Sequence, residues 1–166
     1  MSAPHRQSPP PIEALYRAHA KVVHGIALAH VGWPDADDVV QECFLRIQRG
    51  IESVRDTEAI GAWVAQVARN VARDWLRRRR RRKETVEVNE ELAAPAEPPS
   101  ELGQRLLGFL AELPLAYRET LALRLVEGLG GEEIAARTGL TPGSVRVNLC
   151  RGMAMLRTKV AEAGWP

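Results

Sequence analysis

Residues 141–157 carry the side chains of this 166-residue chain that are best suited to recognise another molecule. Thr141 is a good N-cap, and Pro142 suits the first position of a helix, where no backbone N–H is needed. The helix that follows presents arginines that can reach phosphates or the edge of guanine, namely Arg146, Arg151 and Arg157. The chemistry of this segment is therefore binding to duplex DNA.

A shorter helical segment precedes this helix and completes a helix-turn-helix pattern. Residues 131–135 begin the segment, Gly139 fits the turn, and Ala135 is small enough to let the two helices cross closely. The second helix has apolar residues at helical spacing on its inner face: Val145, Leu149, Met153 and Leu156. We expect the second helix of this unit to lie in DNA.

A second cationic segment is the run of six arginines at 77–82, which ends a long predicted helix. Thr57 is expected to cap this helix, and Trp63 and Trp75 lie on its apolar stripe, where aromatic residues usually belong to the core. Asn70 needs a polar partner, because a helix that looks buried rarely holds an unpaired amide. The arginines either bind phosphates, which adds affinity without sequence specificity, or form a solvated helix end.

Acidic residues gather at the start of another predicted helix. Asp35 is expected to cap it, and for this residue a purely structural role is the simpler interpretation. Asp38, Gln41, Glu42 and Arg46 lie near one stripe, because residues three, four and eight apart are neighbours on a helix. Carboxylates beside a carboxamide can pair with arginines and with backbone groups.

Apolar residues recur at helical spacing along the chain, and no segment alternates as a strand would. We predict an all-α protein of two small helical domains joined by a flexible linker: a disordered tail at 1–11, a three-helix domain at 12–83, an acidic linker at 84–100 and a four-helix domain at 101–163. Residues 1–83 contain 15 Lys and Arg against 9 Asp and Glu, whereas 84–103 contain six Glu and no base. The free-state arrangement of the domains stays open.

Several function classes find no support in the composition. Cys43 and Cys150 match no metal or redox spacing, and we expect buried or half-buried thiols in a reducing cytoplasm. His19 and His24 are five residues apart and do not share a helix face. No signal peptide, membrane span, P-loop or nucleophile motif is present, so we expect no catalytic residue, metal, cofactor or small-molecule substrate and no membrane insertion.

From about Leu15 to Lys159 the chain resembles the extracytoplasmic-function (ECF) sigma factors, the small two-domain specificity subunits of bacterial RNA polymerase. Four motifs in the family's order carry the resemblance. They are DDVVQECF at 37–44, AWV through ARNVARDWLR at 62–77, LP with RE at 113–119, and LVEG with EIA at 125–135. The implied fold is sigma domain 2 followed by sigma domain 4.

The resemblance also implies partners and site residues. The first motif would bind core RNA polymerase through Asp38, Gln41, Glu42 and Phe44. The second would melt and read the minus-10 promoter element through Asn70, Arg73, Arg77, Arg78, Arg80 and Arg81. Residues 49–59 would complete a pocket for a base flipped out of this element. The helix-turn-helix would read the minus-35 element through Ser144, Arg146, Val147, Asn148, Cys150 and Arg151. An anti-sigma factor is a further implied partner.

Some features depart from the family or allow another interpretation. Val147, Asn148 and the Cys150-Arg151-Gly152 triplet replace more usual residues, which leaves the recognised bases open. The acidic linker is either a tether or a segment that threads toward the polymerase active centre. A stand-alone DNA-binding regulator is the main alternative function, although residues 1–100 show no receiver domain or sensor pocket, and an enzyme is the third class.

Overall fold

The structure, a computed structural model, describes residues 8–85 and 97–165, and these residues form helices and connecting turns without any strand. The first three helices are α1 (Ile12–Val31), α2 (Trp33–Gly50) and α3 (Ile60–Thr85), with the 3-10 turns η1 (Ile51–Ser53) and η2 (Thr57–Ala59) before α3. The later elements are α4 (Glu101–Ala111), α5 (Leu115–Leu121), the π turn η3 (Ala122–Val126), α6 (Gly131–Thr138) and α7 (Pro142–Glu162). The predicted all-α class is confirmed.

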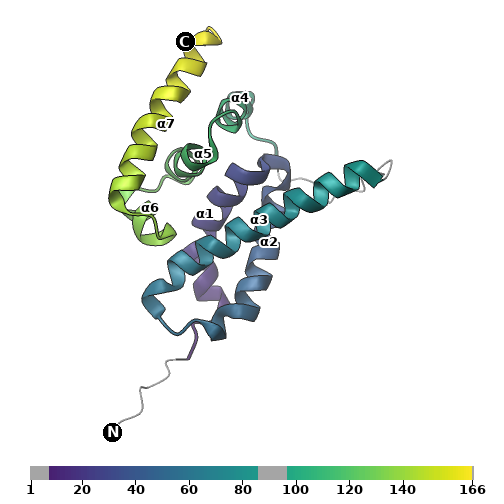
Figure 1. The fold of residues 1–166 in the computed structure, drawn as a ribbon, viewed down its shortest axis with the longest axis vertical. Coiled ribbons are helices and arrows are strands. Elements are labelled where there is room, and N and C mark those ends of the chain that lie inside the picture. Colours follow the sequence, from purple (N-terminus) through teal and green to yellow (C-terminus); the bar gives the residue numbers. More distant parts are fainter. Residues whose placement is uncertain (1–7, 86–96, 166) are drawn as a thin grey trace.

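Helices α1, α2 and α3 form the N-terminal lobe, in which α3 crosses the other two (Figure 1). Gly32, with φ of +82°, makes the sharp connection between α1 and α2, a backbone conformation that favours glycine. The core of the lobe consists of side chains from all three helices that are wholly shielded from solvent, including Val22, Val23, Ile26, Val39, Cys43, Ile47, Val64, Ala68 and Val71. Trp63 and Trp75 pack partly buried against this core, as predicted.

Two predicted helix caps in this lobe are wrong. Helix α2 begins at Trp33, with Pro34 in its first turn, so Asp35 lies inside the helix and does not cap it. Thr57 is the first residue of a 3-10 turn, and the cap is Asp56, whose carboxylate accepts a hydrogen bond of 2.9 Å from the backbone N–H of Glu58. Helix α2 therefore starts earlier than predicted, whereas α3 starts later, at Ile60, after the 3-10 turn that Asp56 caps.

Helices α4 to α7 form the C-terminal lobe. Ser100 caps α4 by accepting a hydrogen bond from the Gly103 N–H, and Leu113-Pro114 separates α4 from α5. Gly139, with a left-handed φ of +76°, ends α6. Thr141 then caps α7, and Pro142 occupies its first turn. The helix-turn-helix geometry expected from these residues is confirmed.

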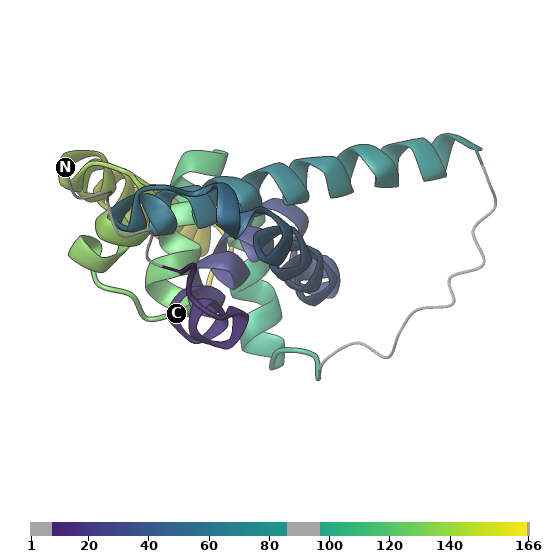
Figure 2. The ribbon, with the colours of Figure 1, turned by 90° about the horizontal axis from the view of Figure 1, so that it is seen from below.

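The two lobes pack against each other in one body (Figure 2). Buried Leu123, Leu129 and Ile134 of the C-terminal lobe join the core that α1, α2 and α3 form. The turn of the helix-turn-helix lies on the start of α3, where a Cβ at Gly139 would come within 2.8 Å of the Ala62 Cβ. The second half of α3 projects beyond the other helices (Figure 2).

Most of the predicted acidic linker and most of the predicted N-terminal tail fall at residues 86–96 and 1–7, outside the described residues. Among the helices that the structure describes, none has both the length and the apolar character needed to cross a bilayer.

Candidate protein- and nucleic-acid-binding surfaces

The docking face is the set of α2 residues expected to bind a protein partner: Asp38, Gln41, Glu42 and Phe44. Asp38 and Gln41 are exposed one turn apart, so both side chains are available to a partner. Phe44 is buried instead, and its ring lies 4.8 Å from that of Tyr16 between ring centres. Of the four residues of the docking face, Phe44 is therefore the one that faces inward, where it packs α2 against Tyr16 of α1 and is not available to a partner.

Glu42 is half-buried and already paired within the protein. Its carboxylate accepts hydrogen bonds of 2.8 Å from Arg46 Nη2 and 2.7 Å from Arg78 Nη2. Partial burial acts to raise the pKa of Glu42, but the hydrogen bonds from Arg78 and Arg46 outweigh it and the pKa is lowered. Arg46 also donates to Asp74 on α3 at 3.0 Å. This network ties the docking face to the arginine-rich half of α3.

Asn70 lies on the exposed side of α3 rather than on a buried face. Its side-chain oxygen accepts hydrogen bonds from Gln66 Nε2 at 3.1 Å and from Arg73 Nη2 at 2.8 Å. Arginine can only donate, so the carbonyl oxygen of Asn70 faces Arg73 and its NH2 group points elsewhere. Asn70 and Arg73, two predicted DNA-binding residues, therefore form one polar unit on this helix.

The arginine run divides into paired and unpaired members. Arg78 bonds to Glu42 and stacks over the Trp75 ring, while Arg79 pairs with Asp35. Arg77 lies 3.6 Å from Asp74 in a looser ion pair. Arg80 and Arg81 are exposed, and no side-chain ion pair involves them among the described residues. The cations free for a polyanion are those at the projecting end of α3.

Helix α7 places the predicted minus-35 residues along one outer face. Ser144, Arg146, Val147, Cys150 and Arg151 are exposed and Asn148 is partly so. Because the Ser144 hydroxyl oxygen accepts a 2.8 Å hydrogen bond from Thr141, its own hydrogen remains free to donate. The predicted set is thus brought together on a single helix face.

The opposite side of α7 holds the helix in the lobe. Val145 and Leu156 are buried, and Leu149 and Met153 pack partly buried, which confirms the predicted inner face. Gly152 belongs to this side, because a Cβ there would lie 3.0 Å from Leu121 Cδ1 and 3.2 Å from Tyr117 Cβ. The glycine that departs from the family pattern therefore allows α7 to approach α5 closely.

The two thiols differ in environment. Cys43 is fully buried, and burial raises its pKa to about 12, so it is unreactive. Cys150 is exposed on α7, and the expectation that it is at least half-buried is wrong, because its position faces away from α5. No cluster of three metal-ligating side chains occurs in the described parts of the chain.

Sequence reasoning missed the polar contacts between the lobes. Glu119 of α5 is buried and accepts hydrogen bonds from Arg69 Nε at 3.0 Å and Nη2 at 2.5 Å, with His30 Nε2 at 3.3 Å. His24 pairs with Glu127 at the end of η3. The two partners in each of these pairs are between 50 and 103 residues apart in the chain, so no local spacing predicts the pairs.

Two sequence models of known families match the chain in the order of its lobes. Sigma-70 region 2 matches residues 15–82, which cover α1, α2 and most of α3. Sigma-70, region 4 matches residues 103–156, which cover α4 through most of α7. The match therefore includes the docking face, the arginine-rich helix and the helix-turn-helix.

Relatives and solved structures agree with these matches. The ECF RNA polymerase sigma factor SigE of Mycolicibacterium smegmatis is 33% identical to this chain. The match covers 92% of this chain but only 63% of SigE. RNA polymerase sigma factor CarQ of Myxococcus xanthus is 32% identical, with 90% of this chain and 89% of CarQ covered. The sigma factor RpoE from Bartonella quintana, solved with the anti-sigma factor NepR, shares the fold with a TM-score of 0.58 at 23% identity, with 88% of this chain and 92% of RpoE covered. The chain belongs to the ECF sigma factors of the sigma-70 family.

Proposed function

We propose that this protein binds core RNA polymerase and directs promoter-specific initiation by reading the minus-10 and minus-35 elements. One observation carries the proposal: α3 and α7 each present exposed arginines and polar side chains on the outer face and pack an apolar face inward. They do so within the two regions that match sigma-70 regions 2 and 4. A protein with two such surfaces suits two separate DNA segments.

The N-terminal lobe would dock on polymerase and capture the melted strand. Asp38 and Gln41 offer an exposed carboxylate and amide to arginines and backbone groups of the partner. The polar unit of Asn70 and Arg73 can contact the edge of an extruded base, whose extrusion costs a few kcal/mol. Arg80 and Arg81 add phosphate contacts that track the single strand.

The C-terminal lobe would bind the upstream duplex in the major groove. Helix α7 is the second helix of a helix-turn-helix, and such helices place their N-terminal residues against base edges. Ser144 and Arg146 lie at that end, and Arg146 can donate two hydrogen bonds to guanine. The predicted domain boundaries, 12–83 and 101–163, assign one promoter element to each domain.

The remaining partners follow from this function. Catalysis belongs to the polymerase, so the chain needs no catalytic residue, cofactor or metal of its own. A factor that works on chromosomal DNA acts in the cytoplasm.

The similarity to a sigma factor solved with an anti-sigma factor suggests an anti-sigma protein as a regulatory partner. A connection between the two domains raises the effective concentration of the second site once the first is bound.

Copurification and run-off transcription test the proposal. We expect the purified chain to copurify with core RNA polymerase from the same bacterium and to start transcripts at defined positions on a genomic promoter library. A chain that binds specific DNA without any association with core polymerase would be a stand-alone regulator, and the proposal would be wrong.

A further inference from the structure

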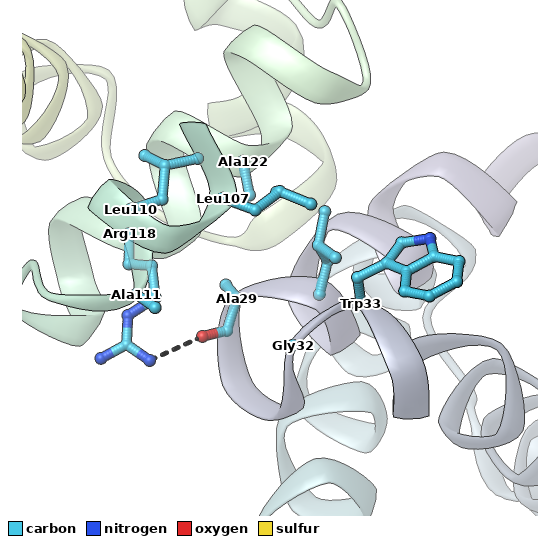
Figure 3. Close-up of a pocket in the computed structure, with 9 residues that line it drawn as sticks. Ala29, Gly32, Trp33, Leu107, Leu110, Ala111, Arg118 and Ala122 are labelled. Atoms are coloured by element: carbon cyan, nitrogen blue, oxygen red, sulfur yellow. Dashed lines mark hydrogen bonds between the residues drawn. The ribbon is translucent and has the colours of Figure 1, made fainter. Parts of the chain in front are cut away.

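The contact between the lobes is specific in its chemistry. Arg118 of α5 donates a 3.0 Å hydrogen bond from Nη1 to the backbone oxygen of Ala29 (Figure 3). Arg137 of α6 donates from Nη1 to the backbone oxygen of Ala18 at 2.9 Å. Each of these arginines reaches across from the C-terminal lobe to a carbonyl of α1. Directed hydrogen bonds of this kind fix one relative placement of the lobes, which apolar packing alone does less well.

Glu119 is the most deeply placed charge of this contact. Its side chain is 8% exposed, and the two groups that bond to it, Arg69 and His30, both belong to the N-terminal lobe, at 19% and 4% exposed. Arg69 approaches through both Nε and Nη2, so the carboxylate is held from two directions. Burial acts to raise the pKa of Glu119, but hydrogen bonds from His30 and Arg69 outweigh it, so the pKa is lowered. The carboxylate is therefore ionised in this contact.

The same contact restrains the DNA-binding helix. Arg69 directly precedes Asn70 on α3, and its guanidinium is occupied by Glu119. Near the start of α3, a Cβ at Gly61 would lie 3.3 Å from the backbone oxygen of Arg137. The C-terminal lobe thus covers one side of the first half of α3.

The packed arrangement is too small to occupy both promoter elements. Elements centred at minus 10 and minus 35 lie about 25 base pairs apart, which is about 85 Å along the duplex. The longest helix, α3, has 26 residues and is therefore about 39 Å long. Two lobes in direct contact cannot place α3 and α7 at such a separation.

We propose that Glu119 is the centre of a latch between the lobes, and that this latch must open before the protein occupies both promoter elements. The need to open rests on the proposed function, whereas the latch itself rests on the contacts alone. Opening exposes Arg69 and the first half of α3. Core polymerase would then bind the open form more tightly than the closed one, and the closed form would lower its apparent affinity.

A cavity at the edge of this contact provides a place to measure opening. It has a volume of about 50 Å³ and lies between the α1–α2 junction and helices α4 and α5 (Figure 3). This volume is far below the roughly 300 Å³ of a small-molecule site, so it does not indicate a ligand. Ala122 lines it and is 2% exposed. An Ala122→Cys thiol fits there and is shielded until the lobes part.

The experiment measures how fast a thiol-reactive disulfide reagent modifies Ala122→Cys. The background carries Cys150→Ser, and the buried Cys43, with its raised pKa, does not react. We expect Glu119→Gln to accelerate modification about tenfold or more, because a neutral amide can still accept a hydrogen bond but no longer balances the positive charge of the largely buried Arg69. In the chain without these cysteine changes, Glu119→Gln should tighten the apparent affinity for core polymerase by a similar factor.

Glu112→Gln is the matched control. Glu112 pairs with Lys159 within the C-terminal lobe, so its loss should leave the modification rate unchanged. Arg137→Gln serves as a second test, because it removes a more exposed contact between the lobes and should accelerate modification by a smaller factor in a folded protein.

Each outcome decides the matter. Equal modification rates in a fully helical Glu119→Gln variant and in its parent would overturn the latch. If that variant loses its helical circular dichroism, the rate of Arg137→Gln decides, and an unchanged rate overturns the latch. If core polymerase binds without accelerating modification of the parent protein, opening is not required, although the proposed function stands. If core polymerase does not bind at all, the proposed function fails while the thiol rates still test the latch.

Discussion

At the scale of single residues, the ion pair between Glu42 and Arg78 links two surfaces that we assign to different partners. Glu42 belongs to the docking face, and Arg78 belongs to the arginine run that would bind the melted strand. A polymerase residue that bonds to Glu42 must compete with Arg78 for the same carboxylate. Both side chains are partly solvent-exposed, so each such exchange involves only about 0.2–1 kcal/mol. Docking and strand capture are therefore coupled weakly.

Asp38 and Gln41 provide the direct test of the docking face. We expect Asp38→Ala combined with Gln41→Ala to weaken binding to core polymerase about tenfold or more, because hydrogen bonds to charged groups contribute about 1.5–3 kcal/mol each. A pull-down titration at physiological salt measures the change. Gln48→Ala, an exposed change on the same helix outside the motif, is the control. Equal affinity of the double variant and the parent would exclude these side chains from docking.

Arg146 tests sequence recognition by α7. Arg146→Ala should cost about 1–3 kcal/mol of binding to a promoter with an intact minus-35 element, as expected for one bidentate base contact. Binding to a promoter with a scrambled element should change little. Electrophoretic mobility shifts of the holoenzyme on the two templates provide the comparison. Equal losses on both templates would reassign Arg146 to a phosphate contact.

At the scale of elements, local signals predicted most helices, and their failures have local causes. The Thr141 cap and the turn at Gly139 depend on neighbouring residues alone, and the sequence predicts them correctly. Asp35 was not a cap because Trp33-Pro34 starts α2 earlier. Where two cap residues compete at one end, spacing alone does not decide between them.

The candidate sites also contain some features that local spacing predicts and others that depend on tertiary packing. The exposed face of α7 follows from helical periodicity, since the residues opposite Val145 and Leu156 must face solvent. The pairing of Glu42 with Arg78, 36 residues away, depends on how α3 crosses α2. The burial of Glu119 depends on the packing of the two lobes. Tertiary packing sets such contacts, and no period in the sequence encodes them.

Gly152 tests how closely α7 packs on α5. Gly152→Ala gains about 1 kcal/mol of helix propensity, but the new Cβ is too close to Tyr117 Cβ, and overpacking costs about 1–3 kcal/mol. We expect urea denaturation of this variant to show no gain in the free energy of unfolding, and a loss of up to about 2 kcal/mol. Gly143→Ala, on the first turn of α7 with no atom within 4 Å, should stabilise the protein. Equal stabilisation by the two changes would contradict the close packing.

At the scale of the whole molecule, the contact between the lobes carries ionisable groups. His24 of α1 faces Glu127 of the C-terminal lobe and Asp37 of α2. The hydrogen bond with Glu127 raises the pKa of His24 above its ordinary value, and this effect outweighs partial burial. A raised pKa means that protonated His24 stabilises the closed form. That stabilisation is complete below the ordinary pKa of 6.5 and is lost as the pH rises through the raised value.

The raised pKa of His24 predicts how the closed form responds to pH. Modification of Ala122→Cys, corrected for ionisation of the thiol, should be slower near pH 6 than near pH 8 by about threefold, as a part-exposed pair contributes about 0.5–1 kcal/mol. His24→Gln should remove this dependence. Glu119, whose pKa is lowered, stays ionised throughout this window and does not produce the effect. A profile that is unchanged by His24→Gln would show that another group titrates.

The projecting end of α3 also affects how proteases cleave the protein. Residues 77–83 offer seven consecutive bonds that trypsin prefers, on exposed residues of a helix end that projects beyond the other helices (Figure 2). A cut there severs the backbone between the lobes but leaves their shared core and the Glu119 contact intact. The two pieces should therefore remain associated as a noncovalent pair until polymerase or denaturant separates them.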